Sequence, residues 1–301
     1  MSNPPRGAAG LPIFPAKAPL GEIFALNRLD DSLFQGRSRG EVSTRTFGGE
    51  VLGQAIIAAG STVPEDRDLH SAQAYYLLPG DTSLPVTYQV TRSRDGGSFT
   101  TRAVSAIQRD RTIFTVTASF QKPPRGEGMT HQSPVMDAPD PDTLPDPLIE
   151  YADEPAALAW VRFSLDHQPI DLRFPEPPTR VLLARGEIAG ARQRAWLRGH
   201  KPIGETSLTH AAGLAYFSDL LLLSSALGPH GRTLSDAALQ FATINHAIWY
   251  HAPLDPSDWF LYDMEGYWTG HDRAMCRGLI FNRSGVLCAS TMQEGLMRNA
   301  R

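Results

Sequence analysis

The strongest constraint on the fold is an internal repeat. Each half of this 301-residue chain consists of one apolar helix-like run followed by four strand-like runs. Pro79 and Pro253 each follow the first of these strands, 174 residues apart, and Asp81 and Asp255 keep the same offset. Agreement of this kind rarely arises from unrelated segments, so it predicts two copies of one supersecondary unit.

The first half begins its repeat at a pair of glycines. After Gly48, apolar residues recur at helical spacing over residues 49–60, and Gly60 with Pro64 ends the pattern. Four strand-like runs follow, at residues 69–78, 85–94, 98–108 and 112–122. The segments between them contain Gly and Asp, which tolerate the backbone angles of tight reversals. The pattern predicts one helix followed by an antiparallel meander.

The second half repeats this order. A helix-like run covers about residues 207–226, and a strand-like run at 191–200 precedes it. The four strand-like runs that follow lie at residues 239–251, 258–268, 273–282 and 285–298. Residues 123–148, between the halves, are rich in Pro, Asp and Gly, which is typical of an extended linker over a surface.

One helix wrapped by an antiparallel sheet, present twice, is the layout of an α+β double hotdog. We expect the two half-sheets to join edge to edge, which would remove exposed strand edges. The predicted boundaries are a disordered lead-in over residues 1–19, an N-terminal hotdog over 20–122, a connector over 123–189 and a C-terminal hotdog over 190–301.

Several separated motifs occur in the order of one known family. They are RTFGGEVLGQAI, HSAQAYYLLPGD, RDGGSF, TASFQ, YFSDL, ATINHAIWYH and ASTMQEGLMRN. Over about residues 20–299, excepting the linker, the chain resembles the acyl-CoA thioesterase II family. The resemblance implies a double hotdog that hydrolyses acyl-CoA to a free acid and CoA. It also implies a catalytic trio at Asp219, Thr243 and Gln293, with Asn245 standing where close members often carry Asp.

The residue types of this trio suit the reaction. A thioester can be hydrolysed without a metal or a covalent nucleophile if a water is held and deprotonated beside its carbonyl. Asp219 is an acid among apolar residues, and such an acid is rarely buried without partners. Thr243 and Gln293 can both donate and accept hydrogen bonds. The three could position one water, with Asp219 as base; the alternative is that they satisfy one another purely for packing.

A developing oxyanion would need backbone N–H donors, and a helix N-terminus supplies them. Gly48 and Gly49 open the first-half helix, so we expect them to be these donors; the alternative is a simple helix-entry turn. The first-half helix has Ile56 where the repeat would place Asp219. We therefore expect one active site per chain, pairing the glycines of one half with the acid of the other.

Other polar residues are weaker candidates. His70, Arg94 and Arg102 are possible substrate-binding residues, although a structural histidine and solvated arginines are the more common interpretations. His246 and His251 are five residues apart, which places them on opposite faces of a strand and disfavours a metal pair. We expect no metal and no other cofactor.

Composition limits the possible partners. A net charge of −4 favours neither nucleic acid nor a membrane surface, and we expect no apolar run to reach the ~20 residues of a membrane span. The N-terminus has no hydrophobic signal region. Cys276 and Cys288 lack CxxC spacing, which predicts buried free thiols in a reducing compartment. We expect a cytoplasmic protein, and the resemblance implies a homo-oligomer, either a dimer or a tetramer.

Two other functions compete with the hydrolase. A double-hotdog enoyl-CoA hydratase would use an Asp–His pair in a GDxNPxH-like element, which the sequence lacks. A non-catalytic acyl-CoA-binding module would be expected to have lost the acid, yet Asp219 is present with both of its companions. The absence of G-x-S-x-G disfavours a serine-hydrolase elbow.

Overall fold

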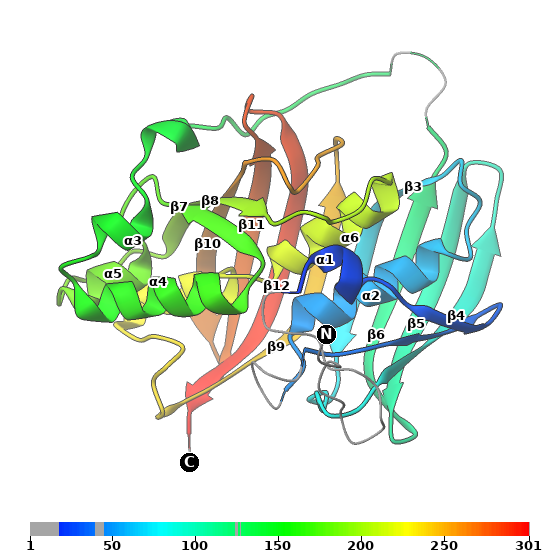
Figure 1. Cartoon of the computed structure of the whole chain (residues 1–301), viewed down its shortest axis with the longest axis horizontal. Coiled ribbons are helices and arrows are strands. Elements are labelled where there is room, and N and C mark those ends of the chain that lie inside the picture. Colours follow the sequence, from blue (N-terminus) through cyan, green and yellow to red (C-terminus); the bar gives the residue numbers. More distant parts are fainter. Residues whose placement is uncertain (1–17, 40–44, 124–125, 127, 301) are drawn as a thin grey trace, which may run out of the picture. The chain divides into compact units, whose positions relative to one another are not determined.

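A computed structural model describes residues 18–39, 45–123, 126 and 128–300 (Figure 1). The chain forms two compact units: Met1–His131 with His200–Phe217, and Gln132–Gly199 with Ser218–Arg301. The predicted lead-in lies almost wholly outside the described residues. The sheet order, the helices and the solved structures reported below confirm the predicted α+β hotdog class.

The first unit contains an antiparallel sheet in the order β1-β2-β4-β5-β6-β3. Its strands are β1 (Asn27–Asp30), β2 (Leu33–Gly36), β3 (Asp68–Tyr76), β4 (Val86–Asp95), β5 (Phe99–Gln108) and β6 (Arg111–Gln121). The last four match the predicted strand-like runs, but β3 pairs with β6 rather than with β4, so only β4, β5 and β6 form the predicted meander. The β1–β2 hairpin was not predicted, because every residue of β1 is exposed and no apolar alternation marks it. Among the described residues that precede it, the single turn α1 (Leu20–Ile23) is helical.

Helix α2 (Gly48–Gly60) packs against this sheet, and its residues 49–59 are all buried. Burial on every side explains why the segment is largely apolar, with Glu50 and Gln54 as its polar side chains, and the predicted helix is confirmed. The part of α6 (Ser207–Ser218) that belongs to this unit crosses α2 closely. A Cβ on Gly49 would lie 2.4 Å from the carbonyl oxygen of Tyr216, so glycine permits the close approach of the two backbones.

The second unit contains an antiparallel sheet in the order β9-β12-β11-β10-β8-β7. Its strands are β7 (Ile170–Arg173), β8 (Arg192–Gly199), β9 (Leu239–Tyr250), β10 (Phe260–Gly270), β11 (Arg273–Asn282) and β12 (Leu287–Asn299). All but β7 match predicted strand-like runs. Cys276 and Cys288 lie on β11 and β12 as buried free thiols, as predicted.

The predicted connector differs from the structure, because residues from Gln132 onward belong to the second unit. Besides β7, this stretch contains η1 (Pro141–Thr143), α3 (Pro147–Glu150), α4 (Pro155–His167) and α5 (Thr179–Ala184), and Figure 1 shows α3, α4 and α5 gathered near β7. Proline opens α3 and α4 at their first turn, where its missing N–H has no intrahelical partner to lose.

The first part of the connector follows the expected extended path over a surface. Met136, Ala138 and Leu144 pack against an apolar cluster of the second sheet, made by Trp196, Trp259, Leu261 and Phe281. The indole Nε1 of Trp196 donates a hydrogen bond of 3.0 Å to the carbonyl oxygen of Pro139. This segment therefore completes the core of the second unit on that face of the sheet.

The predicted helix over 207–226 is shorter than expected. Helix α6 ends at Ser218, Leu221 takes a left-handed φ of 66°, and two short 3-10 turns follow, η2 (Leu223–Ala226) and η3 (Gly228–His230). By length and composition, Ser207–His230 would qualify as a membrane span, with a mean hydropathy of 1.4, contrary to the expectation from sequence. However, 72% of its most apolar window is buried, as in the core helix of a soluble protein.

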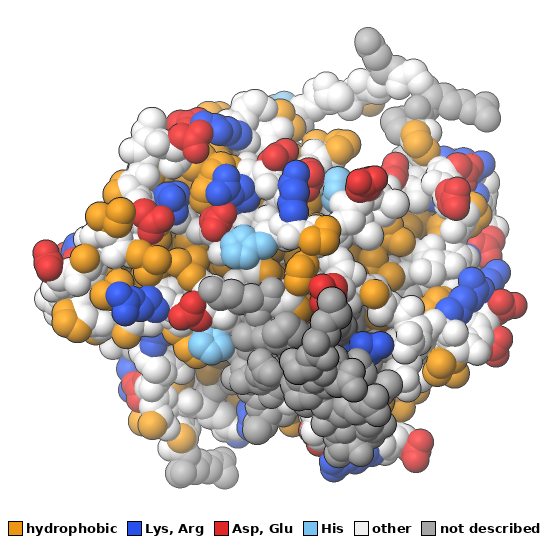
Figure 2. All heavy atoms as spheres, viewed as in Figure 1, with side chains coloured by type: hydrophobic (Ala, Val, Ile, Leu, Met, Phe, Trp, Pro, Cys, Tyr) orange, Lys and Arg blue, Asp and Glu red, His pale blue; other side chains and the backbone are white. Residues whose placement is uncertain are grey.

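Surface charges of the second unit are largely paired. Arg192 lies 2.6 Å from Asp263, Arg194 lies 2.8 Å from Glu176, and further pairs are Arg185–Glu154, Arg198–Asp171 and Arg277–Glu265. Acidic and basic side chains are interspersed on the face shown in Figure 2. On that face, the described acidic and basic side chains form no extended patch of one sign.

Candidate active site

A β-bulge in β9 determines which side chains share the inner face of the second sheet. The register between β9 and β12 passes from Thr243 opposite Gly295 to Asn245 opposite Glu294, which leaves Ile244 unpaired. A single extra residue shifts the alternation of side chains by one. Thr243 therefore lies on the same face as His246, although a spacing of three would place them on opposite faces of a regular strand.

The three residues of the predicted trio come together in the second unit. Gln293 is fully buried on β12, and its Nε2 donates to Asp219 Oδ1 at 2.7 Å and to Thr243 Oγ1 at 2.8 Å. Asp219 immediately follows the last residue of α6. The opposite amide orientation would set Gln293 Oε1 against a carboxylate oxygen, and two acceptors repel, so the carboxylate fixes the orientation.

These two bonds determine what the site can offer a substrate. Both amide hydrogens of Gln293 are used, and Thr243 accepts one of them, so its own hydroxyl hydrogen can be donated elsewhere. Gln293 Oε1 is buried and has no hydrogen-bond partner among the residues that the structure describes. A buried unpaired acceptor is uncommon in a folded protein and marks a position where a small polar molecule could bind.

The surroundings of the trio are buried and contain neutral groups. Tyr262 donates a hydrogen bond of 2.7 Å to the carbonyl oxygen of Ser218; burial, with a contribution from the charge of Asp219, raises its pKa well above the usual value. His246 Nε2 lies 2.8 Å from Ser218 Oγ, and burial lowers the pKa of His246 to about 4. Asp219 therefore lies beside neutral side chains, in surroundings where electrostatic interactions are strong.

Ser218, His246 and Tyr262 were not predicted from the sequence as parts of this site. The only signal was that His246 interrupts an apolar strand, and its spacing alone assigns it no partner. Asn245 lies on the other face of β9 and donates to Glu294 Oε2 at 2.9 Å. The side chain at which this sequence departs from the family pattern therefore points away from the trio.

Gly48 and Gly49 form the first turn of α2 in the first unit. The N-cap residue Phe47 makes no side-chain capping bond, and N–H groups in the first turn of a helix have no intrahelical acceptor. Tyr76 donates a hydrogen bond of 3.1 Å to the carbonyl oxygen of Gly48. Their role as backbone donors, and their alignment with the trio, stay predictions.

His70 is the unpaired residue of a second β-bulge. In β3 the register passes from Leu69 opposite Phe120 to Ser71 opposite Ser119, so this bulge occupies the same place in the repeat as the one at Ile244. His70 Nε2 lies 2.8 Å from Ser119 Oγ, and its ring meets Phe99 edge-to-face. These contacts give it an ordinary structural role, and its role in substrate binding stays a prediction.

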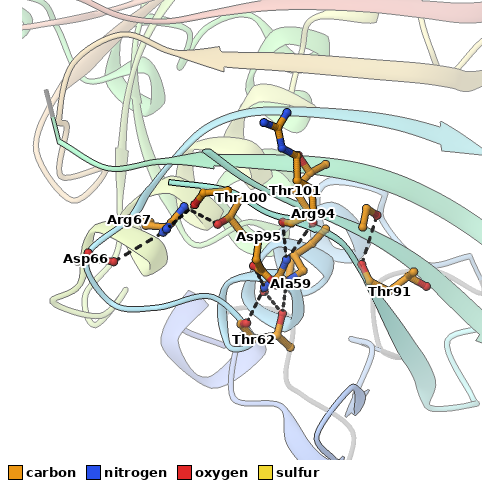
Figure 3. A network of polar contacts seen from close by, with 12 residues as sticks. Ala59, Thr62, Asp66, Arg67, Thr91, Arg94, Asp95, Thr100 and Thr101 are labelled. Carbon is orange, nitrogen blue, oxygen red and sulfur yellow. Dashed lines mark hydrogen bonds and ion pairs between the residues drawn. The ribbon is translucent and has the colours of Figure 1, made fainter. Parts of the chain in front are cut away.

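Arg102 is 1% exposed, and all three of its guanidinium nitrogens donate within the first unit. Its acceptors are the Thr62 side chain and carbonyl, Asp95 Oδ1, and the carbonyls of Arg94 and Thr101. Figure 3 labels the four residues that supply these acceptors. Neither of the roles considered from the sequence, a substrate-binding residue or a solvated cation, fits a guanidinium held in this way. Arg94 is exposed and stays a candidate for binding substrate.

Comparisons with known proteins agree with this architecture. The family model described as acyl-CoA thioesterase matches residues 164–296, and that of the acyl-CoA thioesterase N-terminal domain matches residues 38–121. Human acyl-coenzyme A thioesterase 8 is 35% identical, with 92% of this chain and 88% of the relative covered. Acyl-CoA thioesterase 2 of Haemophilus influenzae is 36% identical, with coverages of 92% and 96%.

Solved structures show the same resemblance. An acyl-CoA thioesterase II from Mycobacterium marinum superposes with a TM-score of 0.74 at 33% identity, covering 93% of this chain and 98% of its own. A hot dog fold protein of unknown function from Alicyclobacillus acidocaldarius also has a TM-score of 0.74, at 20% identity, with coverages of 94% and 98%. The second likeness bears on the fold alone.

Proposed function

Because this chain belongs to the acyl-CoA thioesterase family and is a thioester hydrolase, we propose that it activates its hydrolytic water with Asp219, Thr243 and Gln293. The observation that carries the proposal is the bridge from Gln293 Nε2 to both Asp219 and Thr243. A single amide fixes the acid and the hydroxyl relative to each other, which leaves one buried acceptor for the water itself.

In the proposed reaction, Gln293 Oε1 accepts a hydrogen from the water and the Thr243 hydroxyl donates to its oxygen. Asp219 removes a proton as the water oxygen forms a bond to the thioester carbonyl carbon. The carbonyl π electrons move to oxygen, where the N–H groups of Gly48 and Gly49 stabilise the negative charge. Collapse of this intermediate breaks the carbon–sulfur bond, and the proton held by Asp219 passes to the CoA sulfur.

The test is hydrolysis of a panel of acyl-CoAs, from short to long chains, with free-thiol detection. Asp219→Asn keeps the shape of the side chain and removes its basicity, so kcat should fall by roughly 10²–10⁴. Acyl-CoA binding and Tm should change little. Near-normal turnover in this variant would refute the mechanism, and loss of folding would instead indicate that the trio serves packing.

Thr243→Ala and Gln293→Ala should each lower turnover as well. Since the three residues hold one water, the combined loss should be much smaller than the product of the single losses. Fully multiplicative losses would mean that the residues act independently, which is incompatible with a shared water site.

The place where the enzyme works also stays a prediction. Cys276 and Cys288 are both buried free thiols, which supports a reducing compartment and hence the cytoplasm. Fractionation of the source cells, with detection of the protein in the soluble cytoplasmic fraction, would check it.

A further inference from the structure

We propose that His246 is a positioning residue, which holds Asp219 in place through Ser218. The inference rests on the proposed role of Asp219 as the base. It is carried by the contacts at the end of α6, where the chain leaves the helix and enters the active site.

Ser218 is fully buried and is held from two directions. Its Oγ is 2.8 Å from His246 Nε2, and its carbonyl oxygen accepts a hydrogen bond of 2.7 Å from Tyr262. Carbonyls in the last turn of a helix have no intrahelical donor, so Tyr262 supplies one that the helix cannot. Because Leu221 is left-handed, the helix does not continue to orient Asp219. The two bonds to Ser218 therefore fix the position of the backbone that carries the Asp219 side chain.

His246 and Gln293 are direct partners in the β9–β12 ladder. Directly opposite residues place their Cβ atoms about 4.5–5.5 Å apart on one face of the sheet. Gln293 thus holds the carboxylate of Asp219 from β12, while His246 holds the preceding residue from β9. Two adjacent strands anchor consecutive residues of the active-site turn.

The state of His246 follows from its burial. A neutral imidazole has one donor and one acceptor nitrogen. Its Nδ1 is buried and has no hydrogen-bond partner within the described part of the chain. A buried unpaired N–H is rarer than an under-satisfied acceptor, so we place the hydrogen on Nε2, donating to Ser218 Oγ. This tautomer makes His246 a fixed donor to the active-site turn.

The repeat provides an internal comparison. In the first sheet, Ala72 opposite Ala118 occupies the ladder position that His246 opposite Gln293 occupies in the second. The fold therefore forms at this position without either polar side chain. Both are present in the half that contains Asp219, as expected if they serve the acid.

The test compares variants at both ends of the bond. His246→Leu and Ser218→Ala remove it, whereas His246→Gln keeps a donor near the position of Nε2. We expect kcat to fall about 10- to 100-fold in the first two, since small displacements of reacting groups have effects of this size. KM should change little, and His246→Gln should recover most of the loss. In an Asp219→Asn background, His246→Leu should lower kcat little further.

Tyr88→Phe is the matched control, because it removes another buried hydrogen bond, 2.7 Å from Tyr88 to Gln54 Oε1, in the first unit. Tyr88→Phe should lower Tm, and its effect on kcat should be the same in the wild-type and Asp219→Asn backgrounds. If His246→Leu folds poorly, Ser218→Ala provides the same comparison.

Two outcomes would overturn this inference while the mechanism stands. The first is an unchanged kcat in both His246→Leu and Ser218→Ala. The second arises if Asp219→Asn is itself impaired and the loss of kcat in His246→Leu or Ser218→Ala multiplies fully with the loss in Asp219→Asn. Near-normal turnover in Asp219→Asn would instead remove the proposed mechanism, and with it the role of His246.

Discussion

At the residue scale, the buried His246 should make stability depend on pH. Burial lowers its folded-state pKa to about 4, from an ordinary value near 6.5. Between these values the unfolded chain binds more protons, so the free energy of unfolding should rise with pH, by about 3 kcal/mol over the whole window. This contribution is complete above pH 6.5 and is lost as pH falls towards 4.

His70 and His251 are partly buried and have pKa values lowered in the same direction, so the comparison needs a variant. Denaturant unfolding of the wild type and of His246→Gln, between pH 4 and 7, isolates the contribution of His246. The free energy of unfolding of the wild type, minus that of His246→Gln, should increase as pH rises. A difference that is constant across this range would contradict the prediction.

Two ion pairs should differ sharply in their contribution to stability. Arg39 and Glu50 are 3.0 Å apart with both side chains almost wholly buried, and burial raises the pKa of Glu50. Arg39→Met would leave a buried carboxylate without its cation, so we expect a loss of about 3–5 kcal/mol. Arg283→Ala breaks pairs with Asp140 and Asp142 that are largely exposed and screened by water, so it should change stability far less. Equal effects in denaturant titrations would contradict this.

Individual residues were predictable where their chemistry is visible in the sequence. Asp219, Thr243 and Gln293 stand out as polar residues in apolar runs, and their motifs resemble one family. The bond from His246 to Ser218 was not predictable, because it joins two elements and depends on the bulge at Ile244. Arg102 was misjudged for a related reason, since the groups that surround it come from several segments.

At the element scale, the packing of α2 predicts different tolerance at its two ends. A Cβ on Gly49 would lie 2.4 Å from a backbone oxygen, whereas one on Gly60 would meet the side-chain end of Leu208. We expect Gly49→Ala to lower the free energy of unfolding by about 1–3 kcal/mol. Gly60→Ala should be nearly neutral, because Leu208 can move and alanine favours the helix. Thermal unfolding of both variants checks this, and equal Tm values would contradict it.

Strands were the elements best predicted, because alternation and turn residues mark them directly. The helix predicted over 207–226 was too long, since nothing in its apolar composition reveals the left-handed residue Leu221. The connector was misjudged for the opposite reason. Its prolines suggested a linker, but Pro147 and Pro155 open helices there.

At the scale of the whole molecule, one active site per chain is expected. Titration with a non-hydrolysable acyl-CoA analogue should therefore saturate at one equivalent per chain. Binding of two equivalents with similar affinity would contradict the assignment, because the first unit has Leu69 and Ala118 where the second has Thr243 and Gln293.

Self-association is a separate expectation at this scale. Hotdog proteins usually pack further copies through their sheets or helices, so we expect a dimer or a tetramer. Sedimentation at micromolar concentration should show a species larger than the 32.9 kDa chain. A single 32.9 kDa species would count against it.

The two matching bulges bear on how this chain arose. His70 and Ile244 are unpaired at equivalent places, yet only the second bulge sets a threonine beside a glutamine. A backbone irregularity shared by both copies is most simply inherited from the ancestor that was duplicated, whereas the side chains have since diverged. The first half thus has the same bulged backbone, with Leu69 and Ala118 in place of Thr243 and Gln293. For protein engineering, it is a ready starting point for a second catalytic centre, with Leu69 and Ala118 as the first positions to redesign.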